Sequence, residues 1–152
     1  MVDVKAIALL QGSIVVEEPN DETDFSGFLF KSNDSPPIIG VNSRHAPSRK
    51  RFTIAHELGH LLLHAQSGVH VDEAVVQMRD RKASEGTDEQ EMEANRFAAE
   101  LLMPRRFLEE DLQSMGAIHA DSEQAITGLA KRYGVSPQAM AIRLSSLKLV
   151  WM

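Results

Sequence analysis

The sequence is 152 residues long, the size of one domain, and such a chain can bury most of the apolar surface that its unfolded form exposes. With 43% hydrophobic and 25% charged residues, it has neither a disordered nor a fibrous composition. The lack of cysteine excludes disulfides, thiolate metal ligands and cysteine nucleophiles, so a metal site must use His, Asp or Glu. A formal net charge of −6 argues against broad electrostatic attraction to nucleic acid.

Membrane and exported proteins carry recognisable segments, and neither kind is found in the sequence. No apolar run approaches the roughly 18 residues that a membrane-spanning helix needs. Residues 1–11 lack the basic start and the small-residue cleavage site of a signal peptide. We therefore expect a cytoplasmic protein without membrane contact.

Residues 1–47 predict a short helix followed by a small sheet. Val2–Leu10 shows a weak helical pattern, which Gly12 ends. Three short apolar runs follow, separated by clusters of Pro, Asn, Asp and Ser, and they are Ile14–Val16, Gly27–Phe30 and Ile38–Val41. Short runs separated in this way are typical of an antiparallel sheet, so we expect three antiparallel strands.

Residues 48–103 predict two long helices joined by a long excursion. Ser48 can cap the first helix, because apolar residues recur at helical spacing after it. The positions that we expect to face inward are Ile54, Leu58, Leu61 and Leu62. The excursion, residues 66–86, shows no sustained period, apart from a candidate strand at Val69–Val71, and loops of this length are usually functional.

The second long helix has its own predicted start and stop. Thr87 and Gln90 form a capping box, and Pro104 ends the apolar periodicity that follows them. Pro104 can also start a further helix, which ends before Gly116.

Residues 104–152 predict a helical C-terminal layer. After the helix that ends before Gly116, we expect helices at 126–133 and 136–147, separated by Gly134 and started by Ser136. The whole chain therefore predicts an α+β fold in a single domain, residues 1–152. In it, a small antiparallel sheet packs on the first long helix, and the C-terminal helices form a further layer.

His56, Glu57 and His60 form an HExxH motif on the first long helix. The four-residue spacing puts both imidazoles on one helical face, one turn apart, where they can share a tetrahedral zinc ion. Glu57 lies beside that ion, and its carboxylate can take a proton from zinc-bound water and pass it to a leaving amine. The motif therefore predicts a zinc-dependent endopeptidase with Glu57 as the general base.

A catalytic zinc ion needs a third protein ligand from another segment. His64 lies about 12 Å along the helix from His56, so one ion cannot bind both, and we expect His64 at an interface or supporting a ligand. Glu91 and Glu93 diverge by about 160° around the second helix, so at most one of them can face the metal. Asn95 lies on the face of Glu91, where it can support a ligand imidazole, whereas Glu93 can cap a loop amide or stay solvated.

Two blocks of the sequence together resemble the ImmA/IrrE family of HExxH zinc metallopeptidases, namely RFTIAHELGHLLLH and EMEANRFAAELLMP. The resemblance extends to the preceding VNSRH and to the tail LAKRYGVSPQAMAIRL. It implies a gluzincin-like site in which Glu91, four residues before the Asn of the EAN block, is the third ligand. Family members often cleave helix-turn-helix repressors encoded beside them, so the resemblance also implies such a protein substrate and a role in transcription regulation.

Two other functions compete with hydrolysis. Residues 126–147 have the outline of a DNA-binding helix-turn-helix, and the charged residues after Glu123 are all basic. The second of these helices lacks the clustered Arg, Lys, Asn and Gln that base readout requires, so we do not expect direct binding to nucleic acid. The other alternative is a binding module with a non-catalytic metal site, but such a site gains nothing from Glu57.

Three further features concern the substrate. His45, before the first long helix, and His70, in the excursion, are candidates for stabilising an oxyanion, although a surface histidine is the ordinary interpretation of each. We also expect the strand Ile38–Val41 to lie near a sheet edge. An extended substrate could pair there by strand addition.

Overall fold

The computed structural model describes residues 1–22, 24–64, 68–73 and 85–150. The chain divides within helix α4 (Glu85–Leu102) into two compact units. The sheet unit is Asp3–Ala98, and the helical unit combines Met1–Val2 with Ala99–Met152. The prediction that residues 1–152 form a single domain stays a prediction. Among the described helices, none is long and apolar enough to cross a bilayer, and the cytoplasmic location also stays a prediction.

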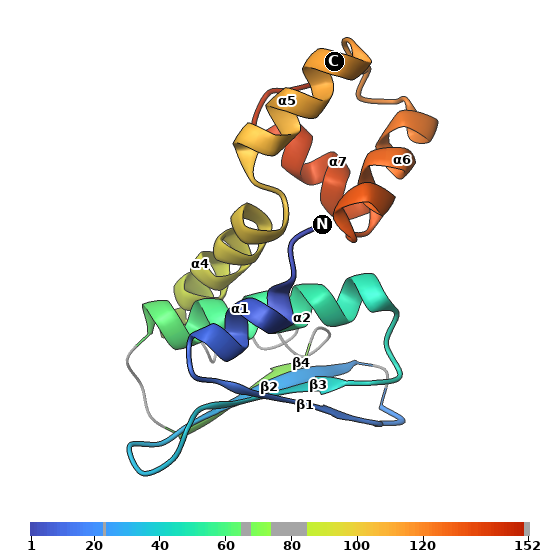
Figure 1. The fold of residues 1–152 in the computed structure, drawn as a ribbon. Helices are drawn as coiled ribbons and strands as arrows, with labels where there is room; N and C mark the ends of the chain where they lie inside the picture. The colour runs from blue at the N-terminus through green and yellow to red at the C-terminus, as the bar shows by residue number, and fades with distance from the viewer. Residues whose placement is uncertain (23, 65–67, 74–84, 151–152) are drawn as a thin grey trace. The chain divides into compact units, whose positions relative to one another are not determined.

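The sheet unit is built on a four-stranded mixed sheet with the order β1-β3-β2-β4 (Figure 1). The strands are β1 (Ile14–Glu18), β2 (Phe25–Lys31), β3 (Ile38–Asn42) and β4 (Gly68–Glu73). The predicted α+β class is confirmed, and the candidate strand in the excursion is confirmed as β4. Residues 66–67 and 74–84 of the excursion lie outside the described residues, and its last two residues are the first two of α4.

The pairing of β1 corrects the antiparallel sheet that the sequence predicted. β2 is antiparallel to both β3 and β4, but β1 runs parallel to β3, with Ile14 opposite Ile38. Because the chain reverses at each end of β2, β3 runs in the direction of β1 and lies beside it. Two strands that are not consecutive in sequence can therefore pair in parallel in a small sheet.

The position of β3 also shows that the predicted edge strand is wrong. β3 lies between β1 and β2, so its backbone hydrogen bonds are used on both sides. Ile39 is fully buried and lies opposite Val15 and Leu29. As far as the structure describes the sheet, its edges are β1 and β4, so an added strand cannot pair with Ile38–Val41.

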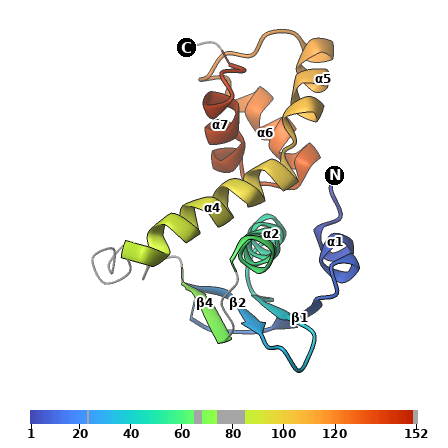
Figure 2. The ribbon, with the colours of Figure 1, turned by 90° about the vertical axis from the view of Figure 1, so that its left-hand side faces the viewer.

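Helices α1 (Val4–Leu10) and α2 (Pro47–Leu63) cover one face of the sheet (Figures 1 and 2). Asp3 caps α1 through its Oδ1, which accepts a hydrogen bond from the Ala6 N–H. Inward residues of α2 and of the strands form the buried core of this unit, including Ile54, Leu58, Leu29, Ile39 and Val41. Leu62, which was expected to face inward, is 47% exposed.

Two helix starts differ from the predicted ones. α2 begins at Pro47, with Ala46 before it, rather than after a Ser48 cap. Proline suits the first position of a helix because its missing N–H would lack a helical partner there, and its fixed φ fits the helix. α4 begins at Glu85, so Thr87 lies inside the helix instead of capping it.

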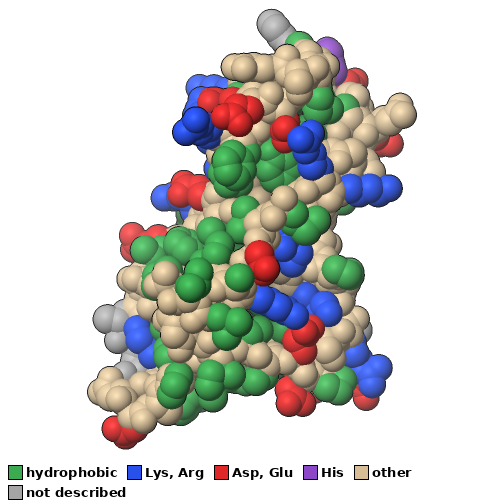
Figure 3. Space-filling view, viewed as in Figure 1, with side chains coloured by type: hydrophobic (Ala, Val, Ile, Leu, Met, Phe, Trp, Pro, Cys, Tyr) green, Lys and Arg blue, Asp and Glu red, His purple; other side chains and the backbone are tan. Residues whose placement is uncertain are grey.

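The helical unit contains three further helices, α5 (Arg105–Met115), α6 (Glu123–Tyr133) and α7 (Pro137–Ser146). Gly134 ends α6 in the left-handed conformation, with φ of 67°, and Ser136 caps α7 by accepting from the Ala139 N–H. These boundaries agree with the predicted ones. Apolar side chains from all three helices are buried, among them Leu108, Leu129, Met140 and Leu144. On the face drawn in Figure 3, Lys and Arg side chains are interspersed with Asp and Glu.

Candidate metal site

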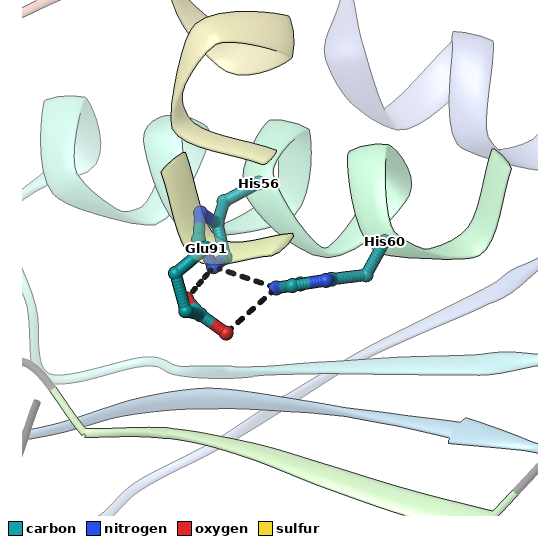
Figure 4. A group of neighbouring side chains, drawn as sticks. All are labelled: His56, His60 and Glu91. Atoms are coloured by element: carbon teal, nitrogen blue, oxygen red, sulfur yellow. Dashed lines mark hydrogen bonds and ion pairs between the residues drawn. The ribbon is translucent and has the colours of Figure 1, made fainter. Parts of the chain in front are cut away.

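The HExxH motif lies in the buried middle of α2. His56, Glu57 and His60 are 2%, 0% and 5% exposed, and every residue from Thr53 to His60 is buried. The helix packs on β2 and β3, and the two histidines point toward Glu91 of α4 (Figure 4). Burial on all sides restricts the rotamers of these side chains, which a metal site requires.

Three donor groups converge where α2 meets α4, as Figure 4 shows. Nε2 of His56 lies 2.9 Å from one carboxylate oxygen of Glu91, and Nε2 of His60 lies 2.9 Å from the other. The two Nε2 atoms are 3.2 Å apart. All three residues are buried, and their donor atoms lie within 4.8 Å of one another.

The donor set fits a zinc ion. Ligands at roughly 2.0–2.1 Å from a tetrahedral ion lie about 3.3 Å from one another, close to the separation of the two Nε2 atoms. Two imidazoles and one carboxylate would supply three ligands, the number that catalytic zinc sites use, whereas structural zinc sites use four. The site can therefore hold a metal ion and a reacting group together.

A close crossing of the two helices brings Glu91 to the histidines. Gly59 in α2 faces Ala94 in α4, and a Cβ added at Gly59 would lie 3.2 Å from the Ala94 Cα and 3.1 Å from a ring atom of Phe97. Ala94 is fully buried. Gly59 lies between the two histidines and Ala94 lies between Glu91 and Asn95, and both are small where the two backbones approach each other.

A second set of side chains contacts the Nδ1 atoms of the two histidines, whereas Glu91 contacts their Nε2 atoms. Nδ1 of His56 lies 2.8 Å from Oδ1 of Asn95, the residue whose spacing placed it beside Glu91. Nδ1 of His60 lies 2.8 Å from Nδ1 of His64, and Nε2 of His64 lies 3.3 Å from Oε2 of Glu93. His64 is thus behind a proposed ligand rather than at the donor cluster, whereas Glu93 meets His64 instead of capping a loop amide.

The two ends of α2 are tied to the sheet by lysines. Lys31 on β2 donates to the carbonyls of His64 and Leu61, at 3.0 and 3.4 Å, at the C-terminal end of the helix. Near the N-terminal end, Lys50 donates to Glu17 on β1 at 2.9 Å. Hydrogen bonds from Lys5 and Lys50 lower the pKa of the Glu17 carboxyl below its usual value of 4.5. These contacts fix the helix that carries the histidines.

The two candidate oxyanion residues remain unassigned. His45 lies in the loop before α2, where its Nε2 is 3.4 Å from Nδ2 of Asn42. Asn42 is fully buried and binds the backbone of Asn20 and Phe25, so it shapes this loop. The backbone of His70 lies in β4, but its side chain is outside the described residues.

An HExxH helix on a mixed sheet, with a glutamate from the next long helix at its histidines, defines a metallopeptidase class of domain. The family model Peptidase_M78, described as IrrE N-terminal-like domain, matches residues 11–145, and the chain belongs to this family. The predicted family is therefore confirmed, and the family together with the His-His-Glu group supports a metal cofactor.

Two curated relatives carry the name radiation response metalloprotease IrrE. The protein of Deinococcus radiodurans is 32% identical over 109 residues, 71% of this chain and 30% of that protein. The protein of Deinococcus deserti is 32% identical over 100 residues, 65% of this chain and 32% of that protein. The chain thus spans about a third of the length of these relatives.

A solved structure of a Mycobacterium tuberculosis transcriptional regulator shares the fold. Its TM-score is 0.57 at 18% sequence identity, and the match covers 93% of this chain and 39% of that one. The likeness supports the arrangement of helices and strands described above.

Proposed function

We propose that this chain is a zinc-dependent endopeptidase in which His56, His60 and Glu91 hold the ion and Glu57 is the general base. The observation that carries the proposal is the convergence of two Nε2 atoms and one carboxylate in a buried cluster. Membership of a metallopeptidase family supports it independently. Zinc is favoured over other divalent ions by imidazole ligands and by the three-ligand set.

In the proposed hydrolysis, α2 provides two metal ligands and the general base, and α4 provides the third ligand. A zinc ion, when bound, polarises the scissile carbonyl and lowers the pKa of water to about 7. Glu57, next to His56 and fully buried, accepts a proton from the attacking water and delivers it to the leaving amine.

The substrate that we propose is a protein, and a helix-turn-helix repressor is the specific candidate. The peptidase family supports a protein substrate. The resemblance to ImmA/IrrE proteins, which often act on repressors encoded beside them, supports the specific class and a role in transcription regulation.

The structure argues against the DNA-binding alternative for the helical unit. Arg143, one of the basic residues of the tail, is buried, and its Nε donates to the carbonyl of Met103 at 3.0 Å. Arg132 forms an ion pair with Asp111 at 3.2 Å. Two of the four basic side chains after Glu123 therefore take part in intramolecular contacts, which reduces the charge that phosphates could neutralise.

The metal is tested by zinc content, measured by mass spectrometry on the purified chain. We expect one zinc ion per chain, lost in Glu91→Gln and kept in Glu89→Gln. The control removes the same charge from an exposed position of the same helix. A chain that takes up no zinc would refute the proposed function and favour a binding module without metal chemistry.

The reaction is tested with Glu57→Gln, using β-casein as an unfolded substrate and a repressor from the genomic neighbourhood as a specific one. Because the amide cannot act as a base, the variant should keep zinc and lose cleavage, by about a hundredfold or more. Cleavage products are followed by gel and mass spectrometry. Cleavage by Glu57→Gln at the native rate would defeat the mechanism.

A further inference from the structure

We propose that His64 and Glu93 form a relay that fixes the tautomer and the orientation of His60. The inference rests on the proposed function, because it takes Nε2 of His60 as a ligand atom. It adds two positioning residues to the site, neither of which belongs to the cluster of His56, His60 and Glu91. The relay runs from Glu93 through His64 to Nδ1 of His60.

His60 and His64 meet through two like atoms. Nδ1 of His60 and Nδ1 of His64 are 2.8 Å apart, a hydrogen-bond distance, so one of them must carry a hydrogen and the other must not. A ligand Nε2 needs its lone pair for the metal, so the neutral ring of His60 carries its hydrogen on Nδ1. Nδ1 of His64 must therefore accept.

The tautomer of His64 determines what its other ring nitrogen offers to Glu93. A neutral His64 that accepts at Nδ1 carries its own hydrogen on Nε2, and this atom faces Oε2 of Glu93 at 3.3 Å. An ionised carboxylate can only accept, so Glu93 favours the tautomer of His64 that can receive the hydrogen of His60. Glu93 thus determines which nitrogen of His64 donates, and His64 in turn determines which nitrogen of His60 donates.

The backbone restricts movement of His64. It is the C-cap of α2, and its N–H donates to the carbonyl of His60 at 2.9 Å. The carbonyl of His64 accepts from Lys31 at 3.0 Å. The side chain of His64 is 9% exposed, whereas that of Glu93 is 43% exposed, so the relay extends from a buried ligand to the protein surface.

The two proposed histidine ligands are supported differently. Oδ1 of Asn95 accepts directly from Nδ1 of His56 at 2.8 Å, in one step. His60 depends on an imidazole that must itself be held in one tautomer. Loss of a hydrogen-bond partner behind a ligand typically weakens metal binding about 10- to 100-fold. We expect a loss of this size when His64 cannot accept.

The test compares zinc affinity among variants of the full chain, by competition with a chromophoric chelator. His64→Leu removes the acceptor and should weaken zinc binding about 10- to 100-fold. His64→Asn puts an amide oxygen near the position of Nδ1, so it should recover most of that loss. Glu93→Gln should weaken binding less than His64→Leu does, and Glu89→Gln, the charge control, should leave it unchanged.

A double variant tests whether Glu93 acts through His64. In the His64→Leu background, Glu93→Gln should cause no further loss of zinc affinity, because leucine cannot form the hydrogen bonds that connect Glu93 to His60. The visible spectrum of the Co²⁺-loaded protein should change in His64→Leu and return towards the native one in His64→Asn. Circular dichroism checks that each variant is folded.

The outcomes separate this inference from the proposed function. Native zinc affinity in His64→Leu, or equal losses in His64→Leu and His64→Asn, would overturn the relay alone. A native chain that binds zinc but cleaves no protein would overturn the proposed function and leave the relay supported by the affinities. A native chain that binds no zinc would overturn both.

Discussion

The close approach of α2 and α4 at Gly59 can be tested by adding one methyl group. In Gly59→Ala, the new Cβ would lie 3.1–3.2 Å from atoms of Phe97 and Ala94, one of them a backbone Cα. Such contacts are tighter than most contacts of a Cβ atom, so Phe97 and the backbone of α4 at Ala94 must shift by a few tenths of an ångström. Overpacking of this kind costs roughly 1–3 kcal/mol of folding free energy.

The helical preference of alanine opposes this cost. Alanine stabilises a helix interior by about 1 kcal/mol relative to glycine, so the net loss in Gly59→Ala is about 0–2 kcal/mol. Gly128 in α6 is the matched control, because it is exposed and a Cβ there meets no atom within 4 Å. Gly128→Ala should stabilise the protein by up to about 1 kcal/mol. The difference between the two variants then isolates the helix contact.

Two assays measure the effect. Urea unfolding, followed by circular dichroism with zinc removed, gives the difference in stability. Zinc affinity should fall in Gly59→Ala and not in Gly128→Ala, because separating α2 from α4 moves Glu91 away from both histidines. If Gly59→Ala were as stabilising as Gly128→Ala and bound zinc at native strength, the close crossing would not be what sets the site geometry.

Two further predictions concern the contacts at the ends of α2. Glu17→Gln should lower the free energy of unfolding by roughly 0.2–1 kcal/mol at neutral pH. Because the folded pKa of Glu17 is depressed, its contribution is present above pH 4.5 and is lost as pH falls through the lower folded pKa. Stabilities of variant and native protein, measured by denaturation across pH 2–7, should therefore converge at the acid end, and a constant gap would contradict the assignment. Lys31→Met should lower the free energy of unfolding by about 1 kcal/mol, because two carbonyls at the end of α2 lose a charged donor. Thermal unfolding measures the effect, and an unchanged melting temperature would count against it.

The part of the site that could be predicted from the sequence is the part set within single helices. The spacing of His56 and His60, and that of Glu91 and Asn95, each places two side chains on one helical face. The contact of His64 with Glu93 depends instead on how two helices cross, which spacing does not encode. The sequence nevertheless contained an indication of this contact. His64 follows His60 by one helical turn, and Glu93 lies on a different face of its helix from Glu91, so both could lie beside the metal site without being ligands.

The fold was predicted where local patterns decide it and missed where distant segments pair. Gly134 and Ser136 mark helix boundaries through their own backbone and side-chain chemistry, so these boundaries were predicted correctly. The parallel pairing of β1 with β3 depends on a strand between them, and no local pattern reports it. The run of leucines ending at Leu63 covers several helix faces, so periodicity could not show that Leu62 is exposed.

The strand order bears on the sequence of events as the chain is made. β2 and β3 are neighbours in sequence and can form a hairpin early, because closing a short loop costs little entropy. β4 pairs with β2 only after the whole of α2 has been made, and Glu91 follows later still. A growing chain therefore carries HExxH well before it carries the third donor group. On the proposed mechanism, the chain can hydrolyse peptide bonds only when the sheet and both long helices are complete. An incomplete chain therefore could not cleave itself or neighbouring chains.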